Sequence, residues 1–215
     1  MPSPRTDPFV TGLVLGAGGS SRLGRPKQLL PYRDTTLLGH VVGTARACGF
    51  NQIVVAIGGA ADEVRTHVGL GGVDVVVNEA YGAGCSSSIA AALGTVDQCC
   101  DVIVLMLGDQ PGVTAAAVGA LLEGRGDAPL ALCRYDEGRG HPIAFARSTF
   151  ADLADLHGDK GVWRLLGRRA DEVTEVEVRG QIPLDVDTPE DYRAVLAQAG
   201  LEESAGVHGA ARTLA

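Results

Sequence analysis

The chain has 215 residues, which suits a single domain, and 46% of them are hydrophobic while only 4% are aromatic. Its net charge of -8 argues against a nucleic-acid partner, because proteins that bind a phosphate backbone usually present a basic surface. No apolar run approaches membrane-spanning length, and the first ten residues contain no apolar signal-peptide core. The five cysteines form no C-x-x-C pair, which argues against a disulfide framework or a zinc site. We therefore expect a cytoplasmic protein without a membrane or nucleic-acid partner.

A glycine-rich turn follows the first apolar stretch. Residues 9–15 predict a buried strand, and Gly16-Ala17-Gly18-Gly19 come directly after it. Glycines expose backbone N–H groups that can hold anionic oxygens. Arg22 and Lys27 then add fixed positive charge, one as a planar fork and one as a point charge. The pattern predicts a triphosphate site whose nucleotide-binding candidates are Leu15, Gly16, Ala17, Gly18, Gly19, Arg22 and Lys27.

Two other phosphate-binding patterns fit this turn less well. The dinucleotide pattern G-x-G-x-x-G needs a third glycine where this chain has Ser21. The pattern G-x-x-x-x-G-K-[ST] needs Lys and Ser or Thr where Arg25 and Pro26 stand. A strand-to-helix turn with solvated cations remains the plain structural alternative.

The order of the predicted elements indicates the fold class. Helical patterns over 36–48 and 60–68 alternate with apolar strands over 52–57 and 73–77. This β-α-β-α-β order predicts a single-domain, Rossmann-like α/β fold, with a mostly parallel sheet covered by helices on both faces. Further along, the sequence predicts helices over 89–96, 114–122, 149–156 and 189–198, strands over 102–107 and 130–134, an edge strand over 173–178, and a polar connection over 135–140. We expect one domain over 1–200 and a disordered tail over 201–215.

Three serines precede the helix predicted over 89–96. Serine side chains cap helix N-termini, and the free N–H groups of a helix N-terminus also bind anions. Ser86 and Ser87 are therefore candidate nucleotide contacts, although a plain capped loop explains the same residues equally well.

Two carboxylates follow apolar runs. Asp109 comes after the strand predicted over 102–107, and Pro111 prevents that strand from continuing. Asp187 stands before Thr188 and Pro189, which are typical of a helix start. Mg²⁺ binds one or two carboxylates together with phosphate oxygens, so both aspartates are candidate metal ligands. An Asx turn at Asp109 and a capped helix at Asp187 are the structural alternatives.

At family level, the stretch LGAGGSSRLGRPKQLLP resembles the signature G-x-G-x-x-x-R-[ML]-G-x-x-K of nucleotidyltransferases that activate sugars and cofactors. It is most similar to the molybdenum cofactor cytidylyltransferase family, over roughly residues 10–196. The resemblance implies a nucleotidyltransferase fold and an Mg²⁺-dependent transfer of a nucleoside monophosphate from an NTP to a phosphorylated acceptor, with release of pyrophosphate. It implies CTP as donor, molybdopterin as acceptor, and a molybdoenzyme or its chaperone as a further partner.

The resemblance extends to later motifs. The G-x-S-S-S segment with Ser86 and Ser87 implies proximity to nucleotide and acceptor, and the G-D-x-P segment implies that Asp109 binds metal. The D-x-D-T-P-E-D segment implies the same for Asp187, with Asp185 as a weaker candidate.

Two further segments point to the acceptor. The G-H-P segment implies an acceptor contact for His141, and a segment similar to G-D-x-G-A-R implies one for Asp159. Trp163 stands where the family has Arg, and we expect its ring in the core.

The implied catalytic residues are Arg22, Lys27 and Asp109. Arg22 and the glycine N–H groups would hold the β- and γ-phosphates, and Lys27 would neutralise charge around the α-phosphate. Cytidylyltransferases resemble L-A-A-G at the glycine turn and guanylyltransferases L-A-G-G; here Ala17 agrees with CTP, whereas Gly16 departs from both. A GTP-dependent enzyme, a sugar-phosphate nucleotidyltransferase and a non-catalytic nucleotide-binding accessory protein remain alternatives.

Overall fold

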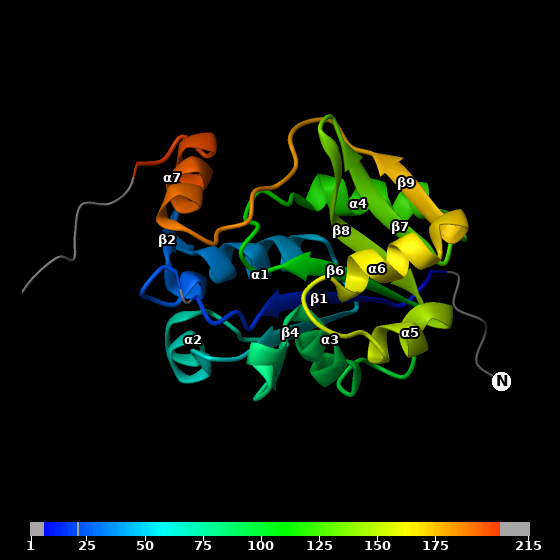
Figure 1. Ribbon diagram of the computed structural model, residues 1–215, viewed down its shortest axis with the longest axis horizontal. Coiled ribbons are helices and arrows are strands. Elements are labelled where there is room, and N and C mark those ends of the chain that lie inside the picture. The colour runs from blue at the N-terminus through cyan, green and yellow to red at the C-terminus, as the bar shows by residue number, and fades with distance from the viewer. Residues whose placement is uncertain (1–6, 21, 203–215) are drawn as a thin grey trace, which may run out of the picture.

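The computed structural model describes residues 7–20 and 22–202. Within them, seven strands form one sheet in the order β5-β4-β1-β6-β8-β7-β9 (Figure 1). The strands are β1 (Val10–Gly16), β4 (Gln52–Ile57), β5 (Asp74–Val77), β6 (Val102–Leu107), β7 (Leu130–Tyr135), β8 (Gly138–Ala146) and β9 (Val173–Glu177). All neighbouring pairs are parallel except the two that involve β8, which confirms the expected mostly parallel sheet.

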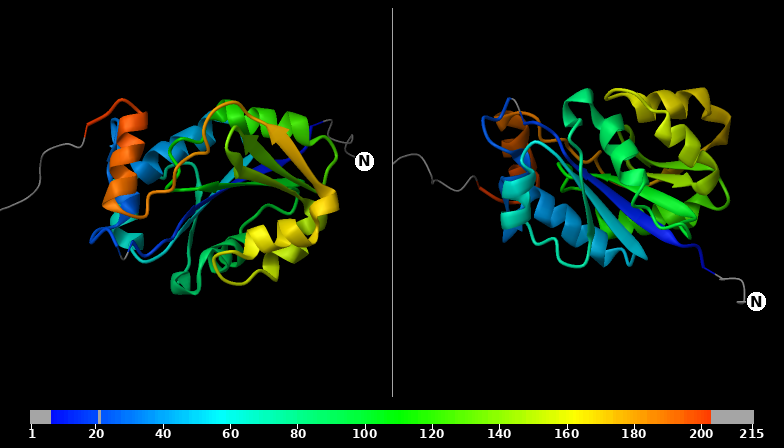
Figure 2. Two further views of the ribbon diagram at one scale, coloured as in Figure 1. Left: turned by 45° about the horizontal axis from the view of Figure 1, so that its top comes forward. Right: turned by 90° about the horizontal axis from the view of Figure 1, so that it is seen from below.

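Helices cover both faces of the sheet, as expected (Figures 1 and 2). They are α1 (Leu37–Ala47), α2 (Ala61–His67), α3 (Cys85–Leu93), α4 (Ala115–Arg125), α5 (Phe150–Ala154), α6 (Gly161–Arg168) and α7 (Pro189–Gln198). Successive side chains of a strand point to opposite faces. Thus Val14 of β1 packs in one hydrophobic cluster with α1, α2 and α4, while Leu13 and Leu15 pack in another with α3, α5 and α6.

A third, smaller cluster holds α7 beside the glycine-rich turn. Tyr192 and Val195 of α7 pack with Leu30, which precedes the hairpin of β2 (Pro31–Tyr32) and β3 (Thr35–Thr36), and with Tyr32 of β2. The Tyr192 hydroxyl also donates to the carbonyl of Pro31 at 2.6 Å. This packing brings the segment before α7 to the cleft edge, although it lies some 160 residues along the chain from Lys27.

One strand was not expected from the sequence. Residues 135–140 were expected to form a connection, but β8 begins at Gly138 and inserts antiparallel between β6 and β7. Gly138, Gly140 and Pro142 are poor strand formers, so local propensity gave no sign of this pairing. His141 therefore lies within a strand rather than in a loop.

Other features agree with the sequence or fall outside the described residues. The edge position of β9 and the cap of α7 by Thr188 are confirmed. Residues 203–215 of the expected tail lie outside the described residues. No helix in the described part of the chain has the length and apolar character needed to cross a membrane.

We expect Thr188→Ala to lower the free energy of unfolding by about 1 kcal/mol, because it removes the side-chain cap of α7. Thr188 Oγ1 accepts the Asp191 N–H at 3.2 Å, and Asp191 Oδ2 accepts the Thr188 N–H at 2.8 Å. Urea denaturation measures the effect. Thr188→Ser keeps the hydroxyl and should keep the stability, whereas equal midpoints for Ala and wild type would contradict a stabilising cap.

Candidate active site

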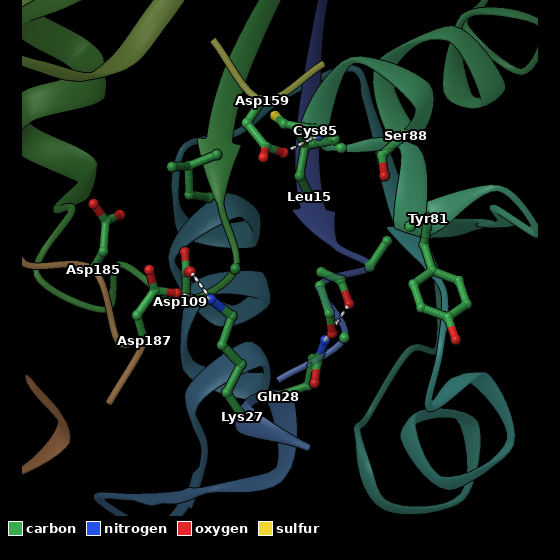
Figure 3. A pocket seen from close by; sticks show the side chains of 18 residues that line it. Leu15, Lys27, Gln28, Tyr81, Cys85, Ser88, Asp109, Asp159, Asp185 and Asp187 are labelled. Carbon is green, nitrogen blue, oxygen red and sulfur yellow. Dashed lines mark hydrogen bonds and ion pairs between the residues drawn. The ribbon is translucent and has the colours of Figure 1, made fainter. Parts of the chain in front are cut away.

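A cleft of about 530 Å³ lies at the carboxyl ends of β1 and β6 (Figure 3). Parallel sheets bind ligands at this edge, where loops leave the strands. The lining residues are Leu15, Gly16, Ala17, Gly18, Gly19, Lys27, Gln28, Tyr81, Gly82, Gly84, Cys85, Ser88, Leu107, Gly108, Asp109, Asp159, Asp185 and Asp187. All five expected residues of the glycine turn therefore line the cleft, together with Lys27 and both expected metal ligands.

Gln28 fixes the shape of the glycine turn, and the sequence analysis missed it. The buried side chain of Gln28 donates from Nε2 to the carbonyls of Gly16 and Gly18, both at 2.8 Å. These two bonds tie the backbone on both sides of Ala17 to one side chain. A Cβ on Gly108 would lie 2.9 Å from the Leu15 carbonyl, so the neighbouring strand end also approaches closely. A polar residue next to Lys27 was the only sequence signal for this role.

Lys27 connects the two expected metal ligands. Its Nζ lies 2.5 Å from Asp109 Oδ2 and 2.9 Å from Asp187 Oδ1. Arg22 reaches the other oxygen of Asp187 at 3.1 Å, but both of these side chains are largely exposed, so we assign that pair little stability. Figure 3 shows Lys27, Asp109 and Asp187 together on one side of the cleft, with Tyr81 and Ser88 on the other side.

The pKa values around Lys27 follow from this arrangement. Burial lowers the pKa of Lys27, but attraction and hydrogen bonding to Asp109 and Asp187 outweigh it and leave the pKa raised. The hydrogen bond from Lys27 in turn lowers the pKa of Asp187. Lys27 is thus firmly protonated, and Asp187 is ionised at neutral pH.

Asp185 also lines the cleft. Burial, reinforced by the charge of Asp109, raises the pKa of Asp185 to about 6. Gln110 donates from Nε2 to Asp185 Oδ1 at 2.8 Å and orients it. The sequence gave Asp185 as a weaker metal candidate, and the structure brings it to the same cleft as Asp109 and Asp187.

The carboxylates fit a divalent cation that also binds phosphate. Asp109 and Asp187 aim oxygens at one cationic atom, Lys27 Nζ, and carboxylate oxygens suit hard cations such as Mg²⁺ or Mn²⁺. Among the described residues, no group of three or more His, Cys, Asp and Glu side chains is placed to hold a metal. A cation here would therefore take further oxygens from a bound ligand.

The serine segment differs from the expectation. Helix α3 begins at Cys85, so the serines lie in its first turn, and its N-cap Gly84 makes no side-chain cap. The Ser86 hydroxyl is buried and donates to the Gly158 carbonyl at 2.5 Å, while Ser87 donates to the Gly84 carbonyl at 2.7 Å. The prediction that serine side chains cap this helix is therefore wrong. The residues that line the cleft include Cys85 and Ser88 but neither Ser86 nor Ser87. Their nucleotide contact stays a prediction.

Asp159 lies where α3 begins. Its Oδ1 accepts the Cys85 N–H at 3.1 Å, so this carboxylate uses one of the free N–H groups of α3. A Cβ on Gly84 would lie 2.6 Å from the same oxygen, and the φ of Gly84 is +99°. Glycine is therefore required for Asp159 to approach the helix.

His141 and Trp163 differ in burial. His141 is buried, and burial lowers its pKa to about 4, so its imidazole is neutral. Trp163 was expected in the core, but 39% of it is exposed. The reason is helical geometry: α6 buries Val162, Leu165 and Leu166, which leaves residue 163 on the flank of the helix.

Comparison with known proteins assigns this chain to a family. The family model of the MobA-like NTP transferase domain matches residues 12–173. The chain belongs to this family. Asp185, Asp187 and α7 lie beyond the matched segment, although both aspartates line the same cleft as the matched residues.

The MobA-like chain is similar to several known proteins. It is 32% identical over 163 residues to nicotine blue oxidoreductase from Paenarthrobacter nicotinovorans, covering 72% of this chain and 79% of that protein. The Rv0371c homolog from Mycobacterium sp. strain JC1 is 53% identical, with a TM-score of 0.85 and coverage of 89% of this chain and 97% of that one. Mycobacterium tuberculosis Rv0371c, solved in complex with manganese, is 47% identical, with a TM-score of 0.79 and coverage of 88% and 98%.

We expect Lys27→Met to raise the pKa of Asp187 toward its ordinary value, because the hydrogen bond from Lys27 is the largest cause of its lowering. A carboxyl-carbon NMR titration measures this directly. Lys160→Met, which removes an exposed lysine beside Asp159, is the matched control and should leave the Asp187 titration unchanged. An unaltered Asp187 titration in Lys27→Met would show that the ion pair is absent in solution.

Proposed function

We propose that this protein is a nucleotidyltransferase that moves a nucleoside monophosphate from CTP to a phosphorylated acceptor, molybdopterin, and releases pyrophosphate. The observation that carries the proposal is the placement of Lys27 between Asp109 and Asp187, in the same cleft that the glycine turn lines. Membership of the MobA-like family supports the reaction class.

In the proposed reaction the chain supplies position and charge. The N–H groups of Gly18 and Gly19, with Arg22, hold the β- and γ-phosphates of the donor. Lys27 turns its ammonium from the carboxylates toward the α-phosphate and neutralises the charge that grows there. A phosphate oxygen of the acceptor attacks the α-phosphorus in line, and pyrophosphate leaves from the opposite side. Such transfers depend on orientation and electrostatics, so the reaction requires no nucleophilic side chain.

Asp109 and Asp187 would hold the divalent cation, Mg²⁺ in this proposal, which offsets phosphate charge when it is bound. The manganese complex of Rv0371c supports a divalent cation in a relative of 47% identity. Asp185 is oriented by Gln110 toward the same cleft and would accept hydrogen bonds from water around the cation.

The proposal also specifies the base of the donor nucleotide and the identity of the acceptor. Ala17 favours CTP by resemblance, and GTP is the alternative at this position. Asp159 lines the cleft and is the residue proposed to contact the acceptor directly. His141 is buried, so it would affect acceptor binding through the side chains that separate it from the cleft. A cytoplasmic site of action, and a molybdoenzyme or its chaperone as recipient of the product, follow from the same resemblance.

A second function is favoured by one relative. The similarity to a protein named nicotine blue oxidoreductase makes oxidoreductase activity on nicotine blue a competing proposal for this chain. The two activities are separable, because only nucleotidyl transfer produces pyrophosphate.

The deciding experiment measures pyrophosphate release from CTP, GTP, ATP and UTP in turn, with Mg²⁺ and molybdopterin. Release with CTP alone supports the whole proposal, and release with GTP alone retains the mechanism but changes the base. Parallel reactions contain glucose 1-phosphate as acceptor, or nicotine blue with NADH or NADPH. Dye reduction without pyrophosphate release from any mixture would reject nucleotidyl transfer.

We expect Asp109→Asn to lower kcat by roughly 100-fold or more, because the neutral amide holds a divalent cation poorly and no longer balances Lys27. Pyrophosphate release under saturating CTP measures the loss. Asp127→Asn removes an exposed carboxylate after α4 and should leave kcat unchanged. Full activity of Asp109→Asn would remove this residue from the mechanism.

We also expect chelation with EDTA to abolish pyrophosphate release, and excess Mg²⁺ or Mn²⁺ to restore it, since the two carboxylates suit both cations. Circular dichroism should stay unchanged, because Lys27 already satisfies Asp109 and Asp187. Persistent release in EDTA would contradict the assigned metal ligands.

A further inference from the structure

Three consecutive serines lie in the first turn of α3, and their hydroxyl groups have different partners. The Ser86 hydroxyl donates to the Gly158 carbonyl at 2.5 Å. The Ser87 hydroxyl donates to the Gly84 carbonyl at 2.7 Å. Ser88 is the member of this run that lines the cleft, and only 4% of the residue is exposed. The first two hydroxyls are therefore bonded to the backbone, whereas the third meets the cleft.

Asn78, which follows β5, sets the hydrogen bonding of the second and third serines. Its side chain is buried, and its Oδ1 accepts the Ala80 N–H at 2.9 Å. Because a backbone N–H can only donate, this contact fixes which end of the amide is the oxygen. The amide nitrogen therefore donates, to Ser87 Oγ at 2.8 Å and to Ser88 Oγ at 2.9 Å. Each of these serine oxygens accepts a bond from Asn78, so each hydroxyl has to donate its own proton elsewhere.

The hydroxyl proton of Ser88 has no acceptor within the described residues. In a helix the usual acceptor is the carbonyl four residues before, which here belongs to Gly84 and takes the proton of Ser87 instead. Nothing else in the described ranges accepts a hydrogen bond from Ser88 Oγ. A buried, unpaired donor costs free energy, and a ligand that supplies an acceptor removes this cost. Since Ser88 lines the cleft, the acceptor atom would lie in the cleft.

Ser88 lies away from the side of the cleft that holds the ion pair. Figure 3 shows Lys27 and Asp109 on one side of the cleft, and Ser88 with Tyr81 on the other side. Tyr81 lies along the glycine turn, since a Cβ on Gly19 would be 3.5 Å from its ring. The proposed phosphate site is at the Lys27 side, so the base is the part of a nucleoside triphosphate that would reach the Ser88 side.

Ala17 and Tyr81 give the Ser88 side of the cleft an apolar surface. Both residues line the cleft. A Cβ on Gly58 would lie 3.0 Å from the Ala17 Cβ and 2.8 Å from the Tyr81 Cβ, so the two side chains meet at Gly58. A methyl group and an aromatic ring suit the flat face of a base, and a single hydroxyl donor suits its edge. Cytosine offers O2 and N3 as acceptors on its edge, and guanine offers O6 and N7.

We propose that the Ser88 hydroxyl, held by Asn78, donates a hydrogen bond to an acceptor atom on the base of the donor nucleotide. The inference deepens the proposed nucleotidyl transfer and rests on it for the identity of the ligand, but binding alone tests it. Cytosine and guanine both carry suitable acceptors, so the contact does not depend on which of these bases is used. Asn78 is a positioning residue, because it acts on the base through Ser88.

The first test is calorimetry with the α,β-methylene analogues of CTP and GTP in the presence of Mg²⁺. These analogues cannot transfer their nucleotide, so the measurement reports binding alone. Ser88→Ala should bind the analogue that wild type prefers about fivefold more weakly, which corresponds to the loss of one hydrogen bond. Equal affinity of wild type and Ser88→Ala would overturn the proposal, and so would the absence of binding of both analogues to wild type.

Inorganic tripolyphosphate separates a lost base contact from a general disturbance of the cleft. This probe carries the phosphates without a base, so wild type and Ser88→Ala should bind it equally, as measured by displacement of the nucleotide analogue. Ser148→Ala removes an exposed hydroxyl after β8, outside the cleft lining, and should bind both probes like wild type. Equal weakening of the nucleotide analogue and tripolyphosphate in Ser88→Ala would overturn the base contact.

Asn78→Asp tests the positioning role with almost no change of shape. The new carboxylate still accepts the Ala80 N–H but can no longer donate to Ser88 Oγ, so it accepts the Ser88 proton and withdraws it from the base. Asn78→Asp should therefore weaken nucleotide binding about as much as Ser88→Ala, and the double variant should lose no more than either single variant. Additive losses in the double variant would show that the two residues act separately and would overturn this role of Asn78.

The two proposals can fail separately. If Ser88→Ala weakens the nucleotide analogue but not tripolyphosphate, the base contact stands even when no triphosphate yields pyrophosphate. If pyrophosphate is released and Ser88→Ala has the nucleotide KM of wild type, nucleotidyl transfer stands and the base contact is overturned.

Discussion

The arrangement of the cleft depends on one ammonium group shared by two carboxylates. Lys27 belongs to the loop after β1, Asp109 follows β6, and Asp187 precedes α7, so this contact joins three distant parts of the chain. Asp109 and Asp187 both contact Lys27 Nζ, so their two negative charges would repel each other if this cation were not between them. In the proposed reaction a divalent cation would take the place of the ammonium between the two carboxylates, so the structural contact and the proposed chemistry have the same electrostatic basis.

Close backbone approaches make that contact possible. Gln28 ties the carbonyls of Gly16 and Gly18, and Gly108 allows β6 to approach β1 where both strands end. Gly84 likewise allows the carboxylate of Asp159 to approach the N-terminus of α3. Side chains at these glycines would separate the turn from the carboxylates. The glycines therefore serve two purposes, since they expose N–H groups and also set the width of the cleft.

The cleft is asymmetric in its chemistry. Its glycine end offers N–H groups and Lys27, which favour an anionic donor, while its other end offers Leu107, Cys85 and Asp159. Membership of the MobA-like NTP transferase family agrees with a nucleoside triphosphate at the first end.

The sequence alone determined the alternation of strands and helices, the glycine turn, and the identity of Lys27, Asp109 and Asp187 as candidates. These features are local, because strand ends, caps and turns follow from periodicity and from neighbouring residues. Only the tertiary structure decided that β8 pairs between β6 and β7, and that the Ser86 hydroxyl donates its hydrogen bond to the Gly158 carbonyl. It also decided that the side chain of Trp163 is partly exposed. These outcomes depend on contacts between residues far apart in the chain, which no local pattern encodes.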